Sequence, residues 1–189
     1  YDAIDQDGKT VQIKANYAEL RARARKLPSA FAFEWRNQKA LEVTAEERQR
    51  EYEERWQEGG PAFIGAFKDL NFSREANETA AEFVRDKIRE IVKDSVVAEA
   101  LCPDYAIGCK RLAVDINYYE TYNRANVTLV DISDEPIERI TGSGVRAKGK
   151  EYPLDSIVLA TGFDAMTGSL LKIDIRGRAG HTLREKWQE

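Results

Sequence analysis

The sequence predicts an α/β protein, in which a helical and highly charged first part gives way near residue 104 to a strand-rich second part. Between residues 17 and 101, apolar residues recur every three or four positions, as they do along one face of a helix. After Pro103, β-branched residues gather in short runs separated by glycines. One such run, residues 157–160, stops at Thr161 and Gly162, which is typical of a buried strand whose backbone comes close to a ligand.

The first elements are short. Residues 1–16 begin with a turn and continue with an alternation of polar and apolar residues at 10–13. The first helix is expected over residues 17–26, which are rich in Ala, Leu, Glu and Arg. Pro28 is expected to end it, because proline cannot continue a helix.

A second helix is expected to begin after Thr44. Thr44 and Glu47 predict a capping box, in which the hydroxyl accepts from the amide three residues on and the glutamate reaches back. Tyr52 and Trp56, four residues apart, then share one face of this helix. Residues 59–61, Gly-Gly-Pro, end it.

A third helix is expected to start near Ser73, and its apolar residues form one buried stripe. Asp94 and Ser95 interrupt it, and a short helix follows as far as Leu101. The stripe consists of Ala76, Ala80, Phe83, Val84, Ile88, Ile91 and Val92.

In the second part, residues 115–126 predict an amphipathic helix whose Tyr119 and Tyr122 pack against a following strand at 126–132. Residues 137–140 and 145–147 predict two strands joined by a tight turn at 141–144. Tyr152-Pro153-Leu154 then leads into the buried run that ends at Thr161.

Composition excludes several classes of function. The 189 residues are 42% apolar and 33% charged, with a net charge of −4 and interspersed signs, which argues against a nucleic-acid partner. No apolar run approaches a membrane span and no secretory signal is visible, so we expect a cytoplasmic protein without a membrane partner. The two cysteines, Cys102 and Cys109, are expected to be free thiols. His181, the single histidine, is expected at the surface, and no metal site is expected.

Two short motifs invite a functional interpretation. Gly142 and Gly144 are spaced as in a dinucleotide-binding loop, but Ala147 stands at the third glycine position and a strand follows, so we expect a hairpin turn. Lys110 and Arg111, just after Gly108, offer two adjacent cations that suit a phosphate or a developing negative charge. An ordinary solvated basic pair remains the alternative for these two residues.

The order of the motifs is similar to the middle of Baeyer–Villiger monooxygenases, flavin enzymes that insert an oxygen atom beside a ketone carbonyl. The resemblance extends from about residue 17 onward. It rests on Arg55-Trp56 with Gly59-Gly60, Ala76-Asn77-Glu78, residues 107–111, residues 118–127, the ATGFDA string at 160–165, and residues 173–177.

The resemblance implies part of a flavoprotein with two dinucleotide-binding domains, one for FAD and one for NADPH. Residues 1–16 would then end a segment of the NADPH domain, and residues 17–103 would form its all-α insertion. Residues 104–160 would return to the NADPH domain in a β-rich segment, and residues 161–189 would enter the FAD domain.

The same resemblance implies a function and its residues. One oxygen atom of O2 would be inserted next to the carbonyl of a small ketone through a peroxyflavin, giving an ester or lactone, while NADPH is oxidised to NADP+ and the other oxygen atom leaves as water. Lys110 would contact the 2′-phosphate of NADPH, and Arg111 would be the catalytic residue that stabilises the anionic peroxyflavin. Ala160, Thr161 and Gly162 would lie close to bound cofactor.

Some family motifs are missing from this sequence, namely both GxGxxG loops and the FxGxxxHxxxW signature. We therefore expect an internal fragment that is inactive by itself. Two alternatives stay open: a flavin monooxygenase that oxygenates nitrogen or sulfur, and a helical interaction module without catalytic activity.

Overall fold

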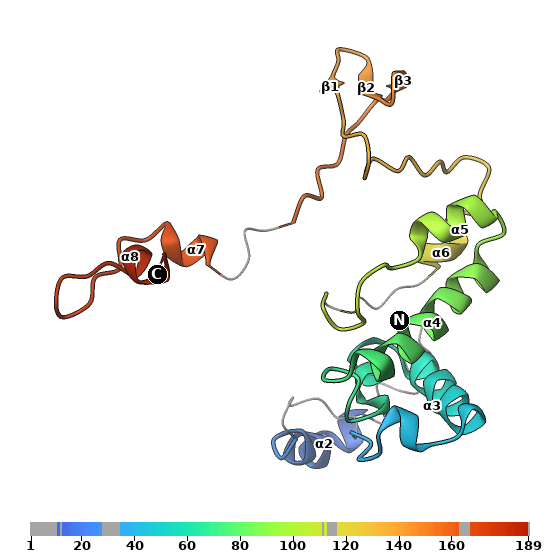
Figure 1. Ribbon diagram of the computed structural model, residues 1–189, viewed down its shortest axis with the longest axis vertical. Helices are drawn as coiled ribbons and strands as arrows, with labels where there is room; N and C mark the ends of the chain where they lie inside the picture. Colours follow the sequence, from blue (N-terminus) through green and yellow to red (C-terminus); the bar gives the residue numbers. More distant parts are fainter. Residues whose placement is uncertain are drawn as a thin grey trace. The chain divides into compact units, whose positions relative to one another are not determined.

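The computed structural model describes residues 11, 13–27, 35–110, 112, 117–162 and 167–188. The chain divides into two units, Tyr1–Asp131 and Ile132–Glu189, and each is described by itself (Figure 1). None of the helices in these ranges is both long and apolar enough to cross a lipid bilayer.

The first unit is built from helices, and α3 and α4 lie side by side at its centre (Figure 1). The helices predicted from residue 17 to residue 101 are all present. Residues 11 and 13–15 are helical as well. The alternation of polar and apolar residues at 10–13 therefore does not mark an extended segment at the positions that the structure describes. The elements are α2 (Tyr17–Ala24), η1 (Ala40–Glu42), α3 (Ala45–Glu58), η2 (Gly60–Ala66), α4 (Arg74–Ile91), α5 (Ser95–Leu101) and α6 (Tyr118–Thr121).

Side-chain caps set the starts of the longer helices. Ser73 Oγ accepts from the amide of Ala76 at 3.2 Å and begins α4. Thr44 Oγ1 accepts from the amide of Glu47 at 3.2 Å and begins α3. The reciprocal half of the expected capping box is absent, because the Glu47 carboxylate accepts from the Arg36 guanidinium instead. Both partners of this bond are ionised, whereas a bond from the backbone amide would have one ionised partner, the carboxylate.

The core of the first unit is an aromatic cluster around Tyr52, whose ring is buried. The centroid of that ring lies 5.5 Å from Phe63, 5.5 Å from Phe67 and 5.4 Å from Phe83. Trp56 adds edge contacts to this group, which confirms the shared face of α3. The stripe of α4 is confirmed too, with these members buried: Ala76, Ala80, Phe83 and Ile88.

A second cluster forms where α4, α5 and α6 meet. Tyr119 and Tyr122 pack there against Ile88, Val92 and Ala98, and not against a following strand as expected. The helix of residues 115–126 is described only as the four residues of α6, and residues 127–132 form no strand. Asn123 accounts for this packing, because its side chain bonds the backbone at the end of α4 and holds α6 beside that helix.

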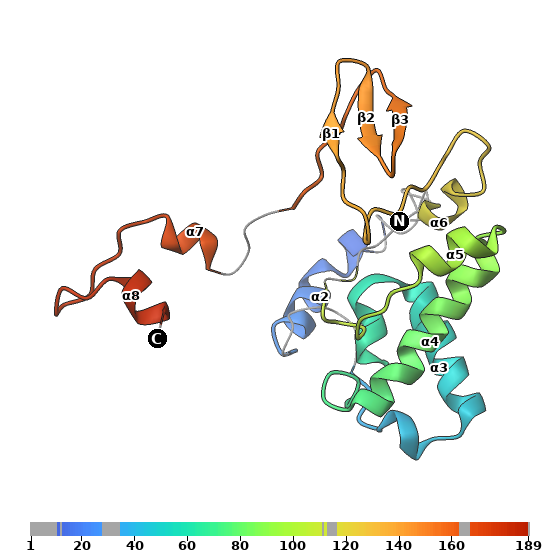
Figure 2. The same ribbon diagram turned by 45° about the horizontal axis from the view of Figure 1, so that its top comes forward.

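The second unit contains a three-stranded antiparallel sheet, β1 (Arg139–Ile140), β2 (Gly144–Ala147) and β3 (Lys150–Pro153), in that order (Figure 2). The pairing of β1 with β2 confirms the hairpin predicted at 141–144. The change from helices to strands comes later than residue 104, because α6 ends at Thr121. The sequence did not predict β3, which pairs with β2. The turn between β2 and β3 places Lys148 and Gly149 at φ +50° and +69°.

The strand expected at 157–161 is not formed. Residues 154–162 carry no regular structure, and Val158 and Leu159 are 89% and 74% exposed. A buried parallel strand needs hydrogen-bonded neighbours and covered faces, and the described part of the second unit offers it neither. Two short helices follow, α7 (Gly168–Leu171) and α8 (Leu183–Trp187), the latter opened by a complete capping box of Thr182 and Glu185.

Candidate anion-binding loop

The candidate site is the loop of residues 105–110, which follows α5 in the first unit. Its central residue, Ile107, is buried and is bound at both of its backbone groups by the side chain of Asn77 on α4. The Ile107 amide donates to Asn77 Oδ1 at 2.9 Å, and the Ile107 carbonyl accepts from Asn77 Nδ2 at 2.8 Å. The same Nδ2 donates to the carbonyl of Leu70 at 2.8 Å. One side chain therefore joins the loop to Leu70 in the turn before α4.

Gly108 gives the loop its sharp change of direction. Its φ of +93° lies in the region that favours glycine, and a Cβ there would stand 2.9 Å from the Asn71 side-chain oxygen. The amide of Cys109 closes the turn by donating to the carbonyl of Ala106 at 3.1 Å. Glycine is thus favoured here by its backbone conformation, whereas the Asn71 side chain could move aside for a Cβ.

Lys110 presents its charge at the surface of this loop. Its ammonium lies 4.3 Å from the centre of the Tyr105 ring, in a cation–π contact. Within the described ranges, no carboxylate pairs with Lys110, whereas Arg55 of α3 and Arg85, Lys87 and Arg89 of α4 all have such partners. An exposed ammonium without a counter-charge can accept an anionic ligand without first breaking an ion pair. Arg111, the predicted catalytic residue, lies outside the described residues.

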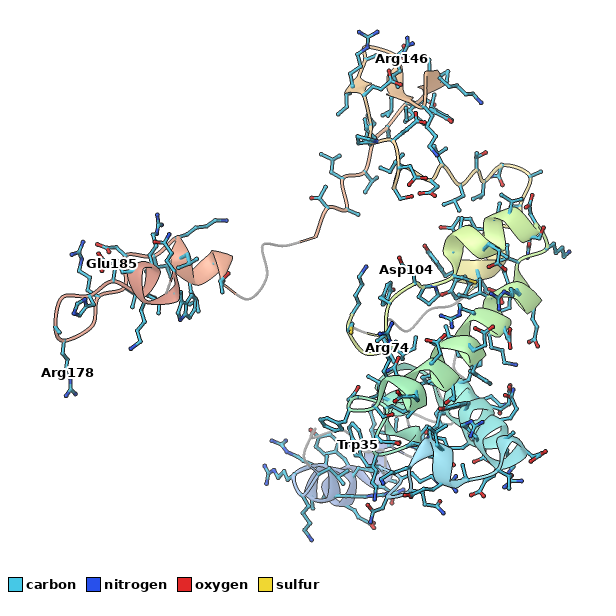
Figure 3. All side chains as sticks on the ribbon, in the orientation of Figure 1. Trp35, Arg74, Asp104, Arg146, Arg178 and Glu185 are labelled. Carbon is cyan, nitrogen blue, oxygen red and sulfur yellow. The ribbon has the colours of Figure 1, made fainter. Side chains whose placement is uncertain are left out.

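Two hollows border the loop within the first unit. One, of about 760 Å³, is lined by the first turn of α4 together with Asp104 and Gly108, and Arg74 and Asp104 are marked in Figure 3. The other, of about 440 Å³, is lined by Lys110 and by aromatic residues, namely Trp56, Phe63, Tyr105, Tyr118 and Tyr119. Lys110 therefore faces a concave surface that offers aromatic planes as well as charge.

The second predicted cofactor segment, Ala160–Gly162, belongs to the second unit, and all three residues are exposed. Gly162 has a φ of +79°, and a Cβ built on it would meet nothing within 4 Å. Its backbone therefore leaves room for close approach by a ligand. This segment and Lys110 belong to separate units.

The remaining candidates are simpler. Cys102 and Cys109 are free thiols, as predicted, and burial raises the pKa of Cys102. His181 is exposed, also as predicted. Over the ranges described above, no group of three or more His, Cys, Asp or Glu side chains could hold a metal ion.

Sequence reasoning missed the importance of Asn77 and Tyr105. A signal for Asn77 was visible, since an amide stands beside Ala76 at the edge of the apolar stripe of α4. A buried polar side chain must find hydrogen-bond partners, so an asparagine there predicts a backbone segment to be bound. Which segment it binds is a matter of tertiary structure.

Comparison with known proteins places these features in context. No family model matches the chain. The chain is 43% identical over 188 residues to a Baeyer–Villiger monooxygenase of Pseudooceanicola batsensis, covering 97% of this chain and 34% of that protein. It is 40% identical to a phenazine N-monooxygenase of Lysobacter antibioticus and 38% identical to a cyclohexanone 1,2-monooxygenase of an Acinetobacter species. Each of these two matches covers 94% of this chain and 33% of the relative.

Solved structures give the same result. A steroid monooxygenase bound to NADP superposes with a TM-score of 0.89 at 50% identity, covering 96% of this chain and 35% of that one. OTEMO in complex with FAD and NADP gives a TM-score of 0.86 at 40% identity, covering 96% of this chain and 34% of that one. The chain thus spans about a third of the length of the relatives that it matches.

Proposed function

We propose that this chain, a homologue of the Baeyer–Villiger monooxygenases along 97% of its length, supplies the NADPH-binding loop and the passage into the FAD domain of such an enzyme. The whole enzyme would insert one oxygen atom of O2 beside the carbonyl of a small ketone and yield an ester or lactone. The observation that carries this proposal is Lys110, an exposed cation without a paired carboxylate in the described chain, held on a rigid loop beside an aromatic-lined hollow.

The residues fit the two nucleotides that the relatives' names and structures mention. A compact ammonium suits a phosphate monoester, so we assign Lys110 to the 2′-phosphate of NADPH. The open backbone at Gly162 suits close approach of FAD, with Ala160 and Thr161 beside it. In this assignment residues 1–16 and 104–160 belong to the NADPH domain, residues 17–103 form its helical insertion, and residues 161–189 enter the FAD domain.

Arg111 completes the proposal as the catalytic residue. When bound, a flavin reduced by NADPH supplies the electrons that activate O2. Arg111 would hold a permanent positive charge against the negative charge that develops during oxygen transfer, because a guanidinium stays protonated where an ammonium can lose its proton on burial.

The experiment that tests this proposal uses the complete protein that carries this chain, purified with FAD. We expect the protein to oxidise NADPH in the presence of a cyclic ketone and to form an ester from that ketone. Gas chromatography of the products detects the ester. Arg111→Ala should lower the rate of ester formation about a hundredfold or more while the flavin stays bound. Arg178→Ala, which changes an exposed arginine, is the matched control and should keep normal activity. Normal ester formation by Arg111→Ala would refute the assignment.

A second candidate is oxygenation of nitrogen. The relative from Lysobacter antibioticus, named as a phenazine N-monooxygenase, is 40% identical over 181 residues and motivates this candidate. Incubation of the same protein with a ketone and with a phenazine separates the two functions. An N-oxide as the only product, detected by mass spectrometry, would replace the ketone proposal.

A further inference from the structure

We infer that Asn77 is a positioning residue for cofactor choice: it holds the 105–110 loop so that Lys110 meets the 2′-phosphate that distinguishes NADPH from NADH. The inference rests on the proposed function, because it takes the NADPH role of Lys110 as its premise. Asn77 itself touches no nucleotide in this account and acts only through the loop.

The side-chain hydrogen bonds of Asn77 go to the 105–110 loop and to the turn before α4. Its side chain is 6% exposed, yet all of its described bonds go to backbone groups, those of Leu70 and Ile107. An apolar side chain could fill the same space in the helix stripe but would leave three buried backbone groups without partners. The amide is therefore explained by what it holds and not by packing.

The anchor is close enough to Lys110 to set its position. Lys110 lies three positions after Ile107, so even an extended chain spans only about 10 Å between them. The left-handed Gly108, the turn from Ala106 to Cys109 and the contact of Lys110 with the Tyr105 ring shorten and stiffen that path. Release of Ile107 would free the loop while the ammonium itself remained intact.

Asn77→Ser and Asn77→Asp test this in the complete, FAD-loaded protein. We expect either change to raise KM for NADPH about tenfold, the size of one lost charge-assisted phosphate contact, with kcat nearly unchanged. KM for NADH should stay the same, since NADH has no 2′-phosphate. A general loss of structure would raise both values together, so the difference between the two cofactors is the readout. Equal effects on NADPH and NADH would overturn the inference.

The aspartate variant adds a pH test. A carboxylate at position 77 would face the carbonyl oxygens of Leu70 and Ile107, and that repulsion favours its protonated form, which can donate to one of them. KM for NADPH in Asn77→Asp, relative to wild type at the same pH, should therefore recover as the pH falls. A ratio that does not change with pH contradicts this account of the hydrogen bonds.

Thr44 provides a control in the same unit. Its hydroxyl accepts from the Glu47 amide at 3.2 Å at the start of α3, and Thr44 lines neither of the two hollows beside the loop. Thr44→Ala should lower thermal stability without changing the ratio of the two KM values. A change of that ratio in Thr44→Ala would show that any loosening of the unit has this effect, and would refute a special role for Asn77.

Two more variants, Gly108→Ala and Lys110→Ala, complete the test. Gly108→Ala strains the loop and leaves Asn77 in place, because an alanine disfavours the φ of +93° that Gly108 adopts; it should raise KM for NADPH alone, even if the Asn77 variants fail to fold. Unchanged NADPH binding by Gly108→Ala overturns the inference. Lys110→Ala separates the two proposals: if it leaves NADPH preference intact, the proposed function of Lys110 fails. If Lys110→Ala removes the preference and the Asn77 variants do not, only the inference on Asn77 fails.

Discussion

Tyr52 combines a fully buried ring with one hydrogen bond at its hydroxyl. The side chain is 1% exposed, and its hydroxyl lies 2.7 Å from Thr79 Oγ1. Because Thr79 Oγ1 donates to the carbonyl of Ala76, the phenol is the donor of this pair. Burial raises the pKa of Tyr52 to about 12, because a phenolate would lose its hydration there. The residue thus links the aromatic core to the second turn of α4 while it stays neutral.

Tyr52→Phe should lower the free energy of unfolding by about 1 kcal/mol at neutral pH, the net value of one buried hydrogen bond. The folded state prefers the neutral phenol, so the contribution of Tyr52 is complete below pH 10 and is lost as the pH rises toward 12. The stability difference between wild type and Tyr52→Phe should therefore shrink over that range. Urea unfolding followed by circular dichroism at several pH values measures it.

Tyr17→Phe is the control, because the Tyr17 side chain is exposed. This variant should unfold like wild type at every pH. A constant difference between wild type and Tyr52→Phe from pH 8 to pH 12 would contradict the assignment of a buried, neutral phenol.

Among the elements, the sheet of the second unit depends on one glycine at a close backbone approach. Gly144 opens β2 opposite Pro153, and a Cβ built on it would lie 1.9 Å from the carbonyl oxygen of Tyr152. Gly142, two residues earlier in the same turn, has nothing within 4 Å of its Cβ position. The two glycines of this GxG pattern therefore have different physical roles in the hairpin.

Gly144→Ala should disrupt the pairing of β2 with β3 at a cost of about 1–3 kcal/mol, the usual range for forcing an extra carbon into filled space. Gly142→Ala is the matched control and should change stability by less than about 0.5 kcal/mol. Hydrogen exchange at the amides of β2 and β3 measures both effects. Full protection of those amides in Gly144→Ala would show that the strands do not approach as closely as described.

At the scale of the whole chain, an apolar segment remains uncovered in the second unit. Val158 and Leu159 are largely exposed, and Leu154 and Ile157 are about half exposed. Contiguous exposed apolar residues on an unpaired extended segment favour pairing with another chain. The 189-residue chain expressed by itself is therefore expected to self-associate through residues 154–159.

Replacement of Val158 and Leu159 by lysine should reduce this self-association, because charges on an unpaired segment oppose strand pairing. The helices of the first unit should unfold as before, with a change of less than about 0.5 kcal/mol. Analytical ultracentrifugation and thermal unfolding by circular dichroism check the two parts. Equal aggregation of the variant and the wild-type chain would show that the chain self-associates through a surface other than residues 154–159.

The sequence by itself determined where the helices between residues 17 and 101 lie, because these depend on interactions between residues three or four positions apart. Thr44 and Ser73 begin their helices where the pattern predicts, and the apolar stripe of α4 is buried. The Thr141–Gly144 hairpin was predictable for the same reason, since its turn is local. The resemblance in motif order also pointed to the relatives that the comparisons identified.

Only the tertiary structure decided which extended segments become strands and how the candidate cation is held. The β-branched residues at 126–132 and 157–161 favour a pleated surface, but a strand forms only where a partner strand supplies hydrogen bonds, and none is described for either run. Lys110 was assigned its role by the resemblance in motif order, because residue type alone left an ordinary solvated basic pair open. Its support comes from Asn77, thirty residues earlier in the chain, and contacts over that separation depend on how the helices pack. The roles of Arg111, Lys110 and Ala160–Gly162 stay predictions.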